Sequence, residues 1–279
     1  KIAIAPAMNQ AMWADDSTVT NLNVLVDRGY HIFGPAEGEQ ACGDVGPGRM
    51  LEPAQLVELS ASLFETGELA GKSFVITGGP TREAIDPVRF ISNHSSGKMA
   101  YALAAEAVAA GAKVTLISGP VNLATPESVK RIDVISAAEM LVATHEAMAD
   151  CDVFIGVAAV ADYRPVEIAA QKIKKSDEQM QLTLVKNPDI ISEVAQLEEK
   201  PFVVGFAAET NDIVSNGKDK LKRKGLDMLF ANNATETFNS DSIAVTALTE
   251  TCETELKAGN KNVVARNMLQ LIATALNER

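Results

Sequence analysis

Short apolar segments alternate with helical patterns through most of the chain, and this alternation constrains the fold more than any other feature. Each apolar segment is rich in Val, Ile or Phe, as buried strands are. The predicted strands are residues 73–77, 113–117, 129–135, 153–157, 202–206 and 228–232. The predicted helices are residues 97–110, 137–149, 188–198 and 211–224. Such alternation is typical of a parallel sheet with helices on both faces. We therefore predict an α/β fold with a doubly wound, mainly parallel, Rossmann-like sheet.

Two segments interrupt this order. Residues 162–186 are polar and end in a strand-like run at 181–185. Residues 241–258 alternate in a way that predicts a hairpin of 242–248 with 253–257. We expect these segments to form an antiparallel extension of the kind that often meets a second subunit.

Four glycine- or alanine-containing segments directly follow predicted strands, at 77–79, 117–120, 157–159 and 206–208. The carboxyl ends of parallel strands meet at one edge of a sheet, and ligands bind there where the strand order reverses. The pattern therefore predicts a single site at this edge.

The segment Phe90–Met99 lies between a glycine-rich turn and a long alanine-rich helix. The first N–H groups of a helix and its dipole attract anions, and Asn93, Ser95, Ser96 and Lys98 add side-chain donors. This arrangement predicts a site for a substrate anion. The same residue types also cap helices without any further function, and that alternative stays open.

Two common phosphate-binding motifs are absent from this region. A P-loop needs a glycine five positions before Gly97-Lys98 and a Ser or Thr after it, where this chain has Ser92 and Met99. The G-x-G-x-x-G fingerprint is also missing between residues 78 and 97, which disfavours a nicotinamide oxidoreductase. A nucleotide-binding scaffold without catalysis stays open as an alternative to an enzyme.

The amino-acid composition limits the classes of partner that this chain is expected to bind. The net charge of −12 argues against nucleic acid. Positive charge is local, in one cluster of Lys172, Lys174 and Lys175 and a second within residues 218–224, which suits a small polyphosphate, although the second also fits a solvated helix face. The 3 cysteines are widely spaced and indicate a reducing, cytoplasmic compartment. No apolar run reaches the roughly 18 residues of a membrane span, so no membrane partner is expected.

Five ordered motifs resemble the phosphopantothenate–cysteine ligase domain of the bacterial bifunctional coenzyme A biosynthesis flavoproteins. The motifs are Gly78–Glu83 with Ser92–Met99, Gly156–Tyr163, Lys172–Lys175, Lys186–Ile190 and Gly205–Thr210. The resemblance implies that CTP reacts with 4′-phosphopantothenate to give an acyl-cytidylate and pyrophosphate. L-Cysteine then displaces CMP to form the amide. The residues alone leave the choice of CTP over ATP open.

By the same resemblance, Lys172 contacts the triphosphate in the first step, and Asn93 binds the acyl-cytidylate and aids the second. Further nucleotide contacts are implied at Gly156, Val157, Ala158, Asp162, Pro188, Asp189, Ile190, Ile191, Phe206, Lys220 and Lys224. Taken singly, each has a structural alternative; Phe206, for example, ends an apolar strand. Mg²⁺ is expected with CTP, held mainly by phosphate oxygens and water, so no protein ligand is identified. Family members are dimers through this domain, which implies a homodimer and a higher oligomer for a full-length protein.

The first part of the chain resembles the partner activity, phosphopantothenoylcysteine decarboxylase. The motifs are Pro6–Trp13 and Ala41–Met50. The resemblance implies that Asn9 binds the substrate carboxylate and that Cys42 protonates the product. Because the flavin-binding turn and active-site His of that family are missing, we expect residues 1–70 to be a C-terminal remnant, with FMN and decarboxylation only in the full-length protein. Residues 71–279 are expected to be the complete ligase domain.

Overall fold

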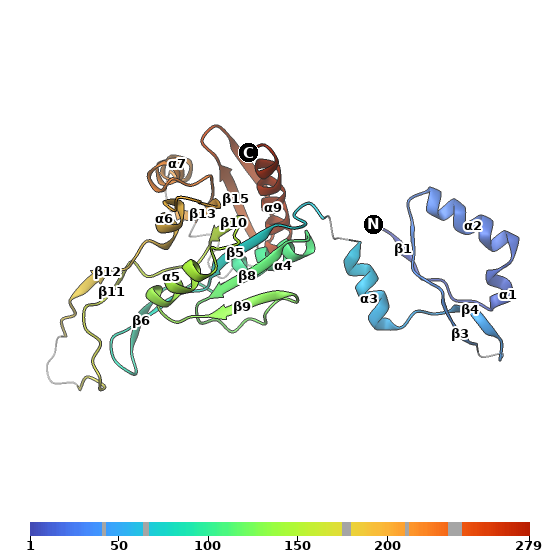
Figure 1. Cartoon of the computed structure of the whole chain (residues 1–279), viewed down its shortest axis with the longest axis horizontal. Coiled ribbons are helices and arrows are strands. Elements are labelled where there is room, and N and C mark those ends of the chain that lie inside the picture. Colours follow the sequence, from blue (N-terminus) through green and yellow to red (C-terminus); the bar gives the residue numbers. More distant parts are fainter. Residues whose placement is uncertain (41–42, 64–66, 175–179, 210–211, 234–241) are drawn as a thin grey trace. The chain divides into compact units, whose positions relative to one another are not determined.

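A computed structural model of the chain describes residues 1–40, 43–63, 67–174, 180–209, 212–233 and 242–279 (Figure 1). The chain divides into two compact units, Lys1–Glu65 and Thr66–Arg279. From the sequence we expected the two parts to be residues 1–70 and 71–279.

The smaller unit is built from short elements. In chain order these are β1 (Ala3–Ile4), α1 (Gln10–Trp13), α2 (Asp16–Asp27), β2 (His31–Ile32), β3 (Ala36–Glu39), β4 (Val45–Arg49) and α3 (Pro53–Ser62). Strands β1 and β2 pair in parallel, and β3 and β4 form an antiparallel hairpin. The side chains of Asn9 and Asp15 accept backbone N–H groups at the starts of α1 and α2, so both helices begin at capping residues.

The larger unit contains an eight-stranded sheet in the order β16-β15-β14-β13-β10-β5-β8-β9. Its strands are β5 (Ser73–Gly78), β8 (Lys113–Ser118), β9 (Val129–Asp133), β10 (Val153–Gly156), β13 (Phe202–Glu209), β14 (Met228–Asn233), β15 (Ser242–Leu248) and β16 (Glu253–Asn260). The strands from β9 across to β14 pair in parallel. The predicted α/β fold with a mainly parallel sheet is confirmed, and each predicted strand is present.

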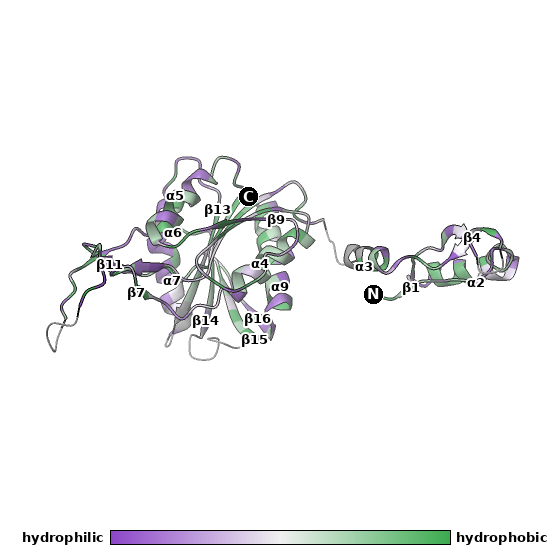
Figure 2. Ribbon diagram, turned by 90° about the horizontal axis from the view of Figure 1, so that it is seen from below, coloured by the Kyte–Doolittle hydropathy of each residue, from purple (hydrophilic) through white to green (hydrophobic). Residues whose placement is uncertain are grey.

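Helices cover both faces of this sheet (Figure 2). They are α4 (Lys98–Ala109), α5 (Ala137–Glu146), α6 (Ile190–Ala195), α7 (Ile213–Lys224) and α9 (Lys261–Asn277). On β5, Phe74 and Ile76 are buried in a core with α4 and α9, whereas Val75 is buried in the opposite core with α5, α6 and α7. Because successive side chains point to opposite faces and both faces are covered, these strands read as continuous apolar runs.

The antiparallel extension is also confirmed. β15 pairs antiparallel with β14 and with β16, as the hairpin pattern predicted. A separate antiparallel pair, β11 (Tyr163–Pro165) with β12 (Leu184–Lys186), stands away from the sheet in Figure 1. The structure adds one pair that the sequence did not suggest, β6 (Arg82–Ala84) with β7 (Phe90–Ser92).

Several helices differ from the predictions, and α1, α2 and α3 of the smaller unit were not predicted. The helix predicted from residue 188 begins at Ile190, because Asp189 is its N-cap and accepts the N–H of Ser192. Pro188 therefore precedes the helix and does not occupy its first turn. Helix α9 was not predicted, although Asn260 caps it through the N–H of Asn262. None of the helices in the described part of the chain combines the length and hydropathy that a bilayer crossing requires.

Candidate functional site

The candidate site lies where the strand order of the large sheet reverses. The chain runs from β5 outward to β8 and β9, then returns to β10 on the other side of β5. Thr77 at the end of β5 lies level with Gly156 at the end of β10, and Gly156 lies level with Gly205 in β13. Parallel sheets bind ligands at this position, because the loops diverge and leave a crevice.

A cavity of about 520 Å³ opens at this edge. Most of the residues predicted to contact the nucleotide line it together. These are Gly156, Ala158, Asp162, Pro188, Asp189, Ile190, Ile191, Phe206, Lys220 and Lys224. Thr77, Tyr163, Lys186 and Asn187 also contribute to the wall and were not assigned from the sequence. Five parts of the chain, at residues 77, 154–163, 186–191, 206 and 220–224, therefore form one pocket, and three of the four predicted strand-end segments contribute to it.

Lysines outnumber carboxylates around this cavity. Lys186, Lys220 and Lys224 line it, against Asp162 and Asp189. Lys220 Nζ donates to the carbonyl of Phe206 at 3.0 Å, which holds the ammonium near the end of β13. The balance of charge favours an anion, although the whole chain is acidic.

Lys224 and Asp189 join α7 to the start of α6 across this pocket. Lys224 Nζ lies 2.7 Å from Asp189 Oδ2. Burial alone would raise the pKa of Asp189, but hydrogen bonds from Lys224 and Ser192 outweigh it, so the net pKa is lowered. Asp189 is therefore ionised at neutral pH and fixes Lys224 beside the pocket.

A second cavity of about 220 Å³ shares part of the same wall. Gly156, Ala158, Ala159 and Phe206 line both cavities. Val157, also predicted to contact the nucleotide, lines only this smaller one among the described cavities.

The smaller cavity is cationic. His94, Ser95, Ser96 and Lys98 reach it from the start of α4, and Lys261 reaches it from the start of α9. No Asp or Glu occurs among the described residues that line it. Two helix N-termini and two lysines therefore meet in one place, which suits a phosphate group.

Glycines shape the entrance to this smaller cavity. Gly97 has φ +74° and precedes α4, and Gly79 has φ +73°. Residues other than glycine rarely adopt a positive φ of this size. A Cβ at Gly79 would also lie 3.0 Å from the carbonyl oxygen of Gly119. The glycine-rich turn therefore brings the loop after β5 close to the start of α4.

Asn93 lies at the rim and not among the residues that line either cavity. Its side-chain amide donates to the carbonyl oxygen of Ala159 at 3.0 Å. Ala159 lines both cavities, so Asn93 touches their shared wall through the backbone. Of the donors predicted around the helix start, Ser95, Ser96 and Lys98 line the smaller cavity, whereas the Asn93 amide faces the loop that contains Ala159.

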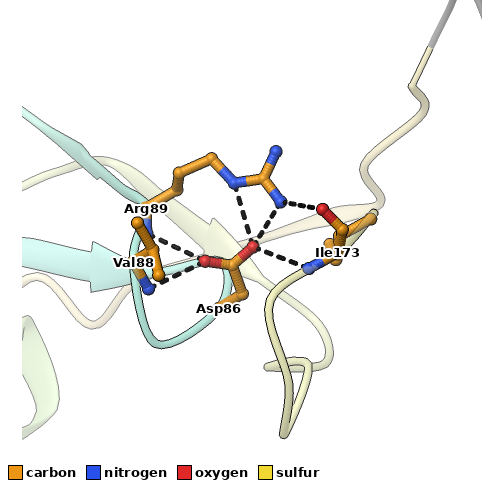
Figure 3. A network of polar contacts seen from close by, with 4 residues as sticks. All are labelled: Asp86, Val88, Arg89 and Ile173. Atoms are coloured by element: carbon orange, nitrogen blue, oxygen red, sulfur yellow. Dashed lines mark hydrogen bonds and ion pairs between the residues drawn. The ribbon is translucent and has the colours of Figure 1, made fainter. Parts of the chain in front are cut away.

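The structure does not bring Lys172 to the cavities. Lys172 is exposed and belongs to neither lining. The next residue, Ile173, is held by Asp86 and Arg89 in the turn between β6 and β7 (Figure 3). Lys174 is exposed as well, and Lys175 lies outside the described residues. The contact of Lys172 with the triphosphate therefore stays a prediction, since Lys172 lines neither of these two cavities.

In the smaller unit, the two predicted motifs lie side by side. Met8 N–H donates to the carbonyl of Gly48 at 2.9 Å, and Asn9 Nδ2 lies 3.1 Å from Asp44 Oδ2. A Cβ at Gly48 would lie 2.1 Å from the carbonyl oxygen of Met8, so only glycine permits this contact. Cys42, the predicted proton donor, lies outside the described residues.

Some features of the site could be recognised only in the structure. Residues 117–120 follow a strand as predicted but line neither cavity; Gly119 packs against Pro80 instead. Lys261 and Asn232 line the smaller cavity although no strand-end motif contains them. The only local signal for Lys261 is its place in the first turn after the cap Asn260. Within the described ranges, no group of three or more His, Cys, Asp or Glu is arranged to hold a metal ion.

Comparison with known proteins gives matches along the whole chain. Residues 69–276 match the family described as DNA/pantothenate metabolism flavoprotein C-terminal domain, and residues 1–65 match the family described as Flavoprotein. The coenzyme A biosynthesis bifunctional protein CoaBC of Vibrio vulnificus strain CMCP6 is 53% identical over 99% of this chain and 70% of its own length. The CoaBC protein of Escherichia coli K12 is 46% identical over 100% of this chain and 70% of its length.

Solved structures agree in fold. The crystal structure of the C-terminal domain of a CoaBC protein is 38% identical, with a TM-score of 0.67, and covers 77% of this chain and 100% of that one. The DNA/pantothenate metabolism flavoprotein from Streptococcus pneumoniae is 25% identical, with a TM-score of 0.65, and covers 73% of this chain and 99% of that one.

These matches correct one expectation. We expected a ligase that carries only a truncated remnant of a decarboxylase in residues 1–70. That interpretation is wrong, because residues 1–65 match the Flavoprotein family and the bifunctional relatives align over 99% to 100% of this chain.

Proposed function

Because the chain belongs to the family of coenzyme A biosynthesis bifunctional proteins, with flavoprotein and C-terminal pantothenate-metabolism parts, we propose that residues 71–279 ligate 4′-phosphopantothenate to L-cysteine with CTP. The observation that carries this proposal is the larger cavity. Ten of the residues expected to contact the nucleotide line it, at the reversal point of the sheet. Its surplus of lysine over carboxylate suits a nucleoside triphosphate.

In the proposed arrangement the nucleotide occupies the larger cavity and its phosphates extend toward the smaller one. Phe206 lines both cavities and offers an aromatic face, while Lys220 and Lys224 stand on the side of α7. Lys98 and Lys261 supply positive charge at the far end, beside two helix N-termini. A nucleotide fits this arrangement, because its base can lie against Phe206 while its phosphates lie near Lys98 and Lys261.

The first step joins the pantothenate carboxylate to the nucleotide. A carboxylate is a poor electrophile, so its oxygen attacks the α-phosphorus of CTP and pyrophosphate leaves, which gives the acyl-cytidylate. Negative charge grows on phosphoryl oxygens in the transition state, and cations held in place stabilise it. We assign this role to Lys172, together with the lysines of the cavities. Lys172 must then reach the phosphates either by a movement of its segment together with the β6–β7 turn that holds it, or from a second copy of the chain.

The second step transfers the acyl group. The amine of cysteine attacks the acyl carbon, CMP leaves, and the amine loses its proton as the amide forms. A neutral amide can donate to the developing oxyanion without binding the starting carboxylate too tightly. We assign this role to Asn93, whose amide group lies at the rim and is already oriented by Ala159.

Mg²⁺ is proposed to accompany CTP. The carboxylates at the larger cavity are few, and one of them, Asp189, is engaged by Lys224. This donor set suits an ion held by phosphate oxygens and water, with little direct contribution from the protein. Mg²⁺ would neutralise phosphate charge; the residues named above bind and orient the substrates.

For the flavoprotein part we propose a role in decarboxylating 4′-phosphopantothenoylcysteine. The packing of Met8 against Gly48 brings Asn9 beside the segment that contains Asp44. A neutral side-chain amide at this point suits recognition of a substrate carboxylate. Asn9 would bind that group and Cys42 would return a proton to the product, while FMN, when bound, would supply the redox chemistry.

The test of the ligase is pyrophosphate release from CTP and 4′-phosphopantothenate, with and without cysteine, beside an ATP control. Products are identified by mass. Pyrophosphate together with 4′-phosphopantothenoylcysteine supports the proposal, and a preference for CTP over ATP decides the nucleotide. Tight binding of CTP without any turnover would support a non-catalytic scaffold instead.

Variants separate the two steps. Lys172→Gln is expected to slow pyrophosphate release strongly, because it removes the positive charge from the first transition state. Asn93→Asp is expected to release pyrophosphate but to accumulate acyl-cytidylate, because an anion cannot stabilise an oxyanion. Amide formation at the normal rate by Asn93→Asp would remove the role assigned to Asn93.

A homodimer through the larger unit is proposed as well. Apolar side chains stand exposed on the arms β6–β7 and β11–β12, among them Val88, Phe90, Tyr163 and Leu184. Large apolar side chains exposed on neighbouring arms favour an interface between chains. Sedimentation at concentrations from nanomolar to micromolar would detect the dimer, and a monomer throughout this range would exclude it.

A further inference from the structure

The turn between β6 and β7 grips the backbone of a distant segment. Asp86 Oδ2 accepts the N–H of Ile173 at 3.2 Å. Arg89 Nη2 donates to the carbonyl of the same residue at 3.0 Å (Figure 3). Both polar groups of Ile173 are therefore fixed by side chains of one turn.

The carboxylate at the centre of this clasp is fully engaged. Asp86 also accepts the N–H groups of Val88 at 2.8 Å and Arg89 at 2.9 Å, and the Nε of Arg89 at 2.9 Å. The Asp86 side chain has no exposed area. The guanidinium of Arg89, followed by these backbone donors, holds the pKa of Asp86 well below its usual range despite burial. The clasp thus stays ionised at every pH at which the protein is assayed.

Lys172 stands between two points of attachment to this turn. On one side, Ala169 N–H donates to the carbonyl of Ile85 at 3.0 Å. On the other side, directly after Lys172, lies the clasped Ile173. A lysine side chain has many rotamers, so its ammonium reaches a defined point only if the backbone beneath it is fixed. The structure supplies that fixation through Asp86.

We propose that Asp86 is a positioning residue for Lys172, acting through the backbone of Ile173; this inference rests on the proposed function. Asp86 does not contact substrate in this arrangement. It sets the course of residues 169–173, and therefore the place from which the Lys172 ammonium approaches the phosphates. A displacement of about 1 Å at a reacting group can cost about a hundredfold in rate.

The test is Asp86→Asn. The substituted amide has one oxygen, so its NH2 group must face either Ile173 and the Arg89 guanidinium or the N–H groups of Val88 and Arg89, and all of these are donors. We expect kcat for pyrophosphate release to fall at least about tenfold. The matched control is Asp227→Asn. Asp227 also accepts a backbone N–H, that of Val203 at 2.8 Å, and pairs with a cation, Lys200, at 3.2 Å, but touches no residue of the 169–173 segment in the described contacts. The control is expected to stay within about twofold of the parent.

A double-mutant cycle separates positioning from general loss of structure. Rates are measured with excess enzyme, so that slow turnover by Lys172→Gln can be recorded. In that background, Asp86→Asn should change the rate less than about twofold, because the group that it positions is gone. Equal losses in both backgrounds would overturn the proposal, and so would full activity of Asp86→Asn alone.

Hydrogen exchange on the unmodified protein gives an independent measurement, in case Asp86→Asn does not fold. The clasp predicts slow exchange of the Ile173 amide, and exchange at the rate of an open chain would overturn the proposal. If the parent protein binds CTP but releases no pyrophosphate while the Ile173 amide is protected, the proposed ligase function fails and the clasp itself stands.

Discussion

Gly119→Ala tests whether the packing of two loops beneath the site controls its activity. Gly119 follows β8, and its N–H donates to the carbonyl of Gly78 at 2.9 Å. A Cβ placed on Gly119 would lie 1.9 Å from the carbonyl oxygen of Pro80 and 2.8 Å from its carbonyl carbon. Both neighbours are backbone atoms, so no side chain can rotate away to relieve the contact.

The magnitude follows from this overlap. An ordinary contact begins at 3.4 Å, so the two loops must separate by 3.4 − 1.9 = 1.5 Å. Overpacking of a close-packed interior costs about 1–3 kcal/mol. At about 2–4 °C per kcal/mol for a unit of this size, the melting temperature should fall by roughly 2–12 °C. Pro80 also bridges to Ala159, which accepts the amide of Asn93, so the displacement reaches the shared wall of the cavities.

Two measurements on Gly119→Ala test whether the two loops pack this closely and whether their packing affects activity. Thermal unfolding should show the loss of stability, and pyrophosphate release should fall by about tenfold or more at a temperature where the variant is folded. Gly259→Ala is the matched control, because its Cβ would meet nothing closer than 3.9 Å. A Gly119→Ala protein with unchanged melting temperature would refute the close approach. A destabilised but fully active protein would refute the link from this loop to the site.

Two further predictions follow from the larger cavity. Phe206→Ala should raise the Kd for CTP by about fivefold to about 150-fold in calorimetric titration, because a base stacked on an aromatic ring gains about 1–3 kcal/mol; unchanged affinity would show that the base lies elsewhere. Asp189→Asn keeps the helix cap but loses the charge that pairs with Lys224. Because the pKa of Asp189 is lowered in the folded protein, its contribution to stability is present above the unfolded pKa of about 3.9 and is lost as pH falls through the folded value. Since the Asp189 side chain is 49% exposed and the pair is screened by solvent, urea unfolding should show at most about 1 kcal/mol of difference at pH 7, and a smaller difference as pH falls below the unfolded pKa of about 3.9. A difference that stays constant into acid would contradict the ion pair as its cause.

The sheet could be predicted from the sequence because its strands carry one unambiguous signal. Residues such as Phe74, Val75 and Ile76 are buried on alternate faces, and both faces are covered. A continuous apolar run of five or six residues therefore has few other structures available. The position of the larger cavity follows from the same cause, since parallel strands place their terminal loops together.

The smaller cavity could not be predicted in the same way. Lys261 reaches it only because α9 packs beside α4, where Arg266 Nε pairs with Glu106 at 2.9 Å. That contact joins residues 160 positions apart, and no local pattern encodes it. The position of Lys172 has a similar origin, because a single turn between β6 and β7 determines where its segment runs. Motif order identified both regions but carried no information on these distances.

Two of the residues expected to contact the nucleotide have a structural role as well. Gly156 and Ile191 were both expected to contact the nucleotide, yet the side chain of Ile191 packs directly against Gly156. A Cβ on Gly156 would lie 2.9 Å from Ile191 Cδ1, and a Cβ on Gly205 would lie 3.2 Å from the same atom. Ile191 therefore fills the gap above two neighbouring strands, and the glycines leave room for this packing whether or not a ligand is present. The consequence for function is indirect: this contact seats α6 on the sheet, and α6 carries Asp189, which fixes Lys224 at the pocket. Substitution at Gly156 should thus impair nucleotide binding by moving α6, even if the base never touches that residue.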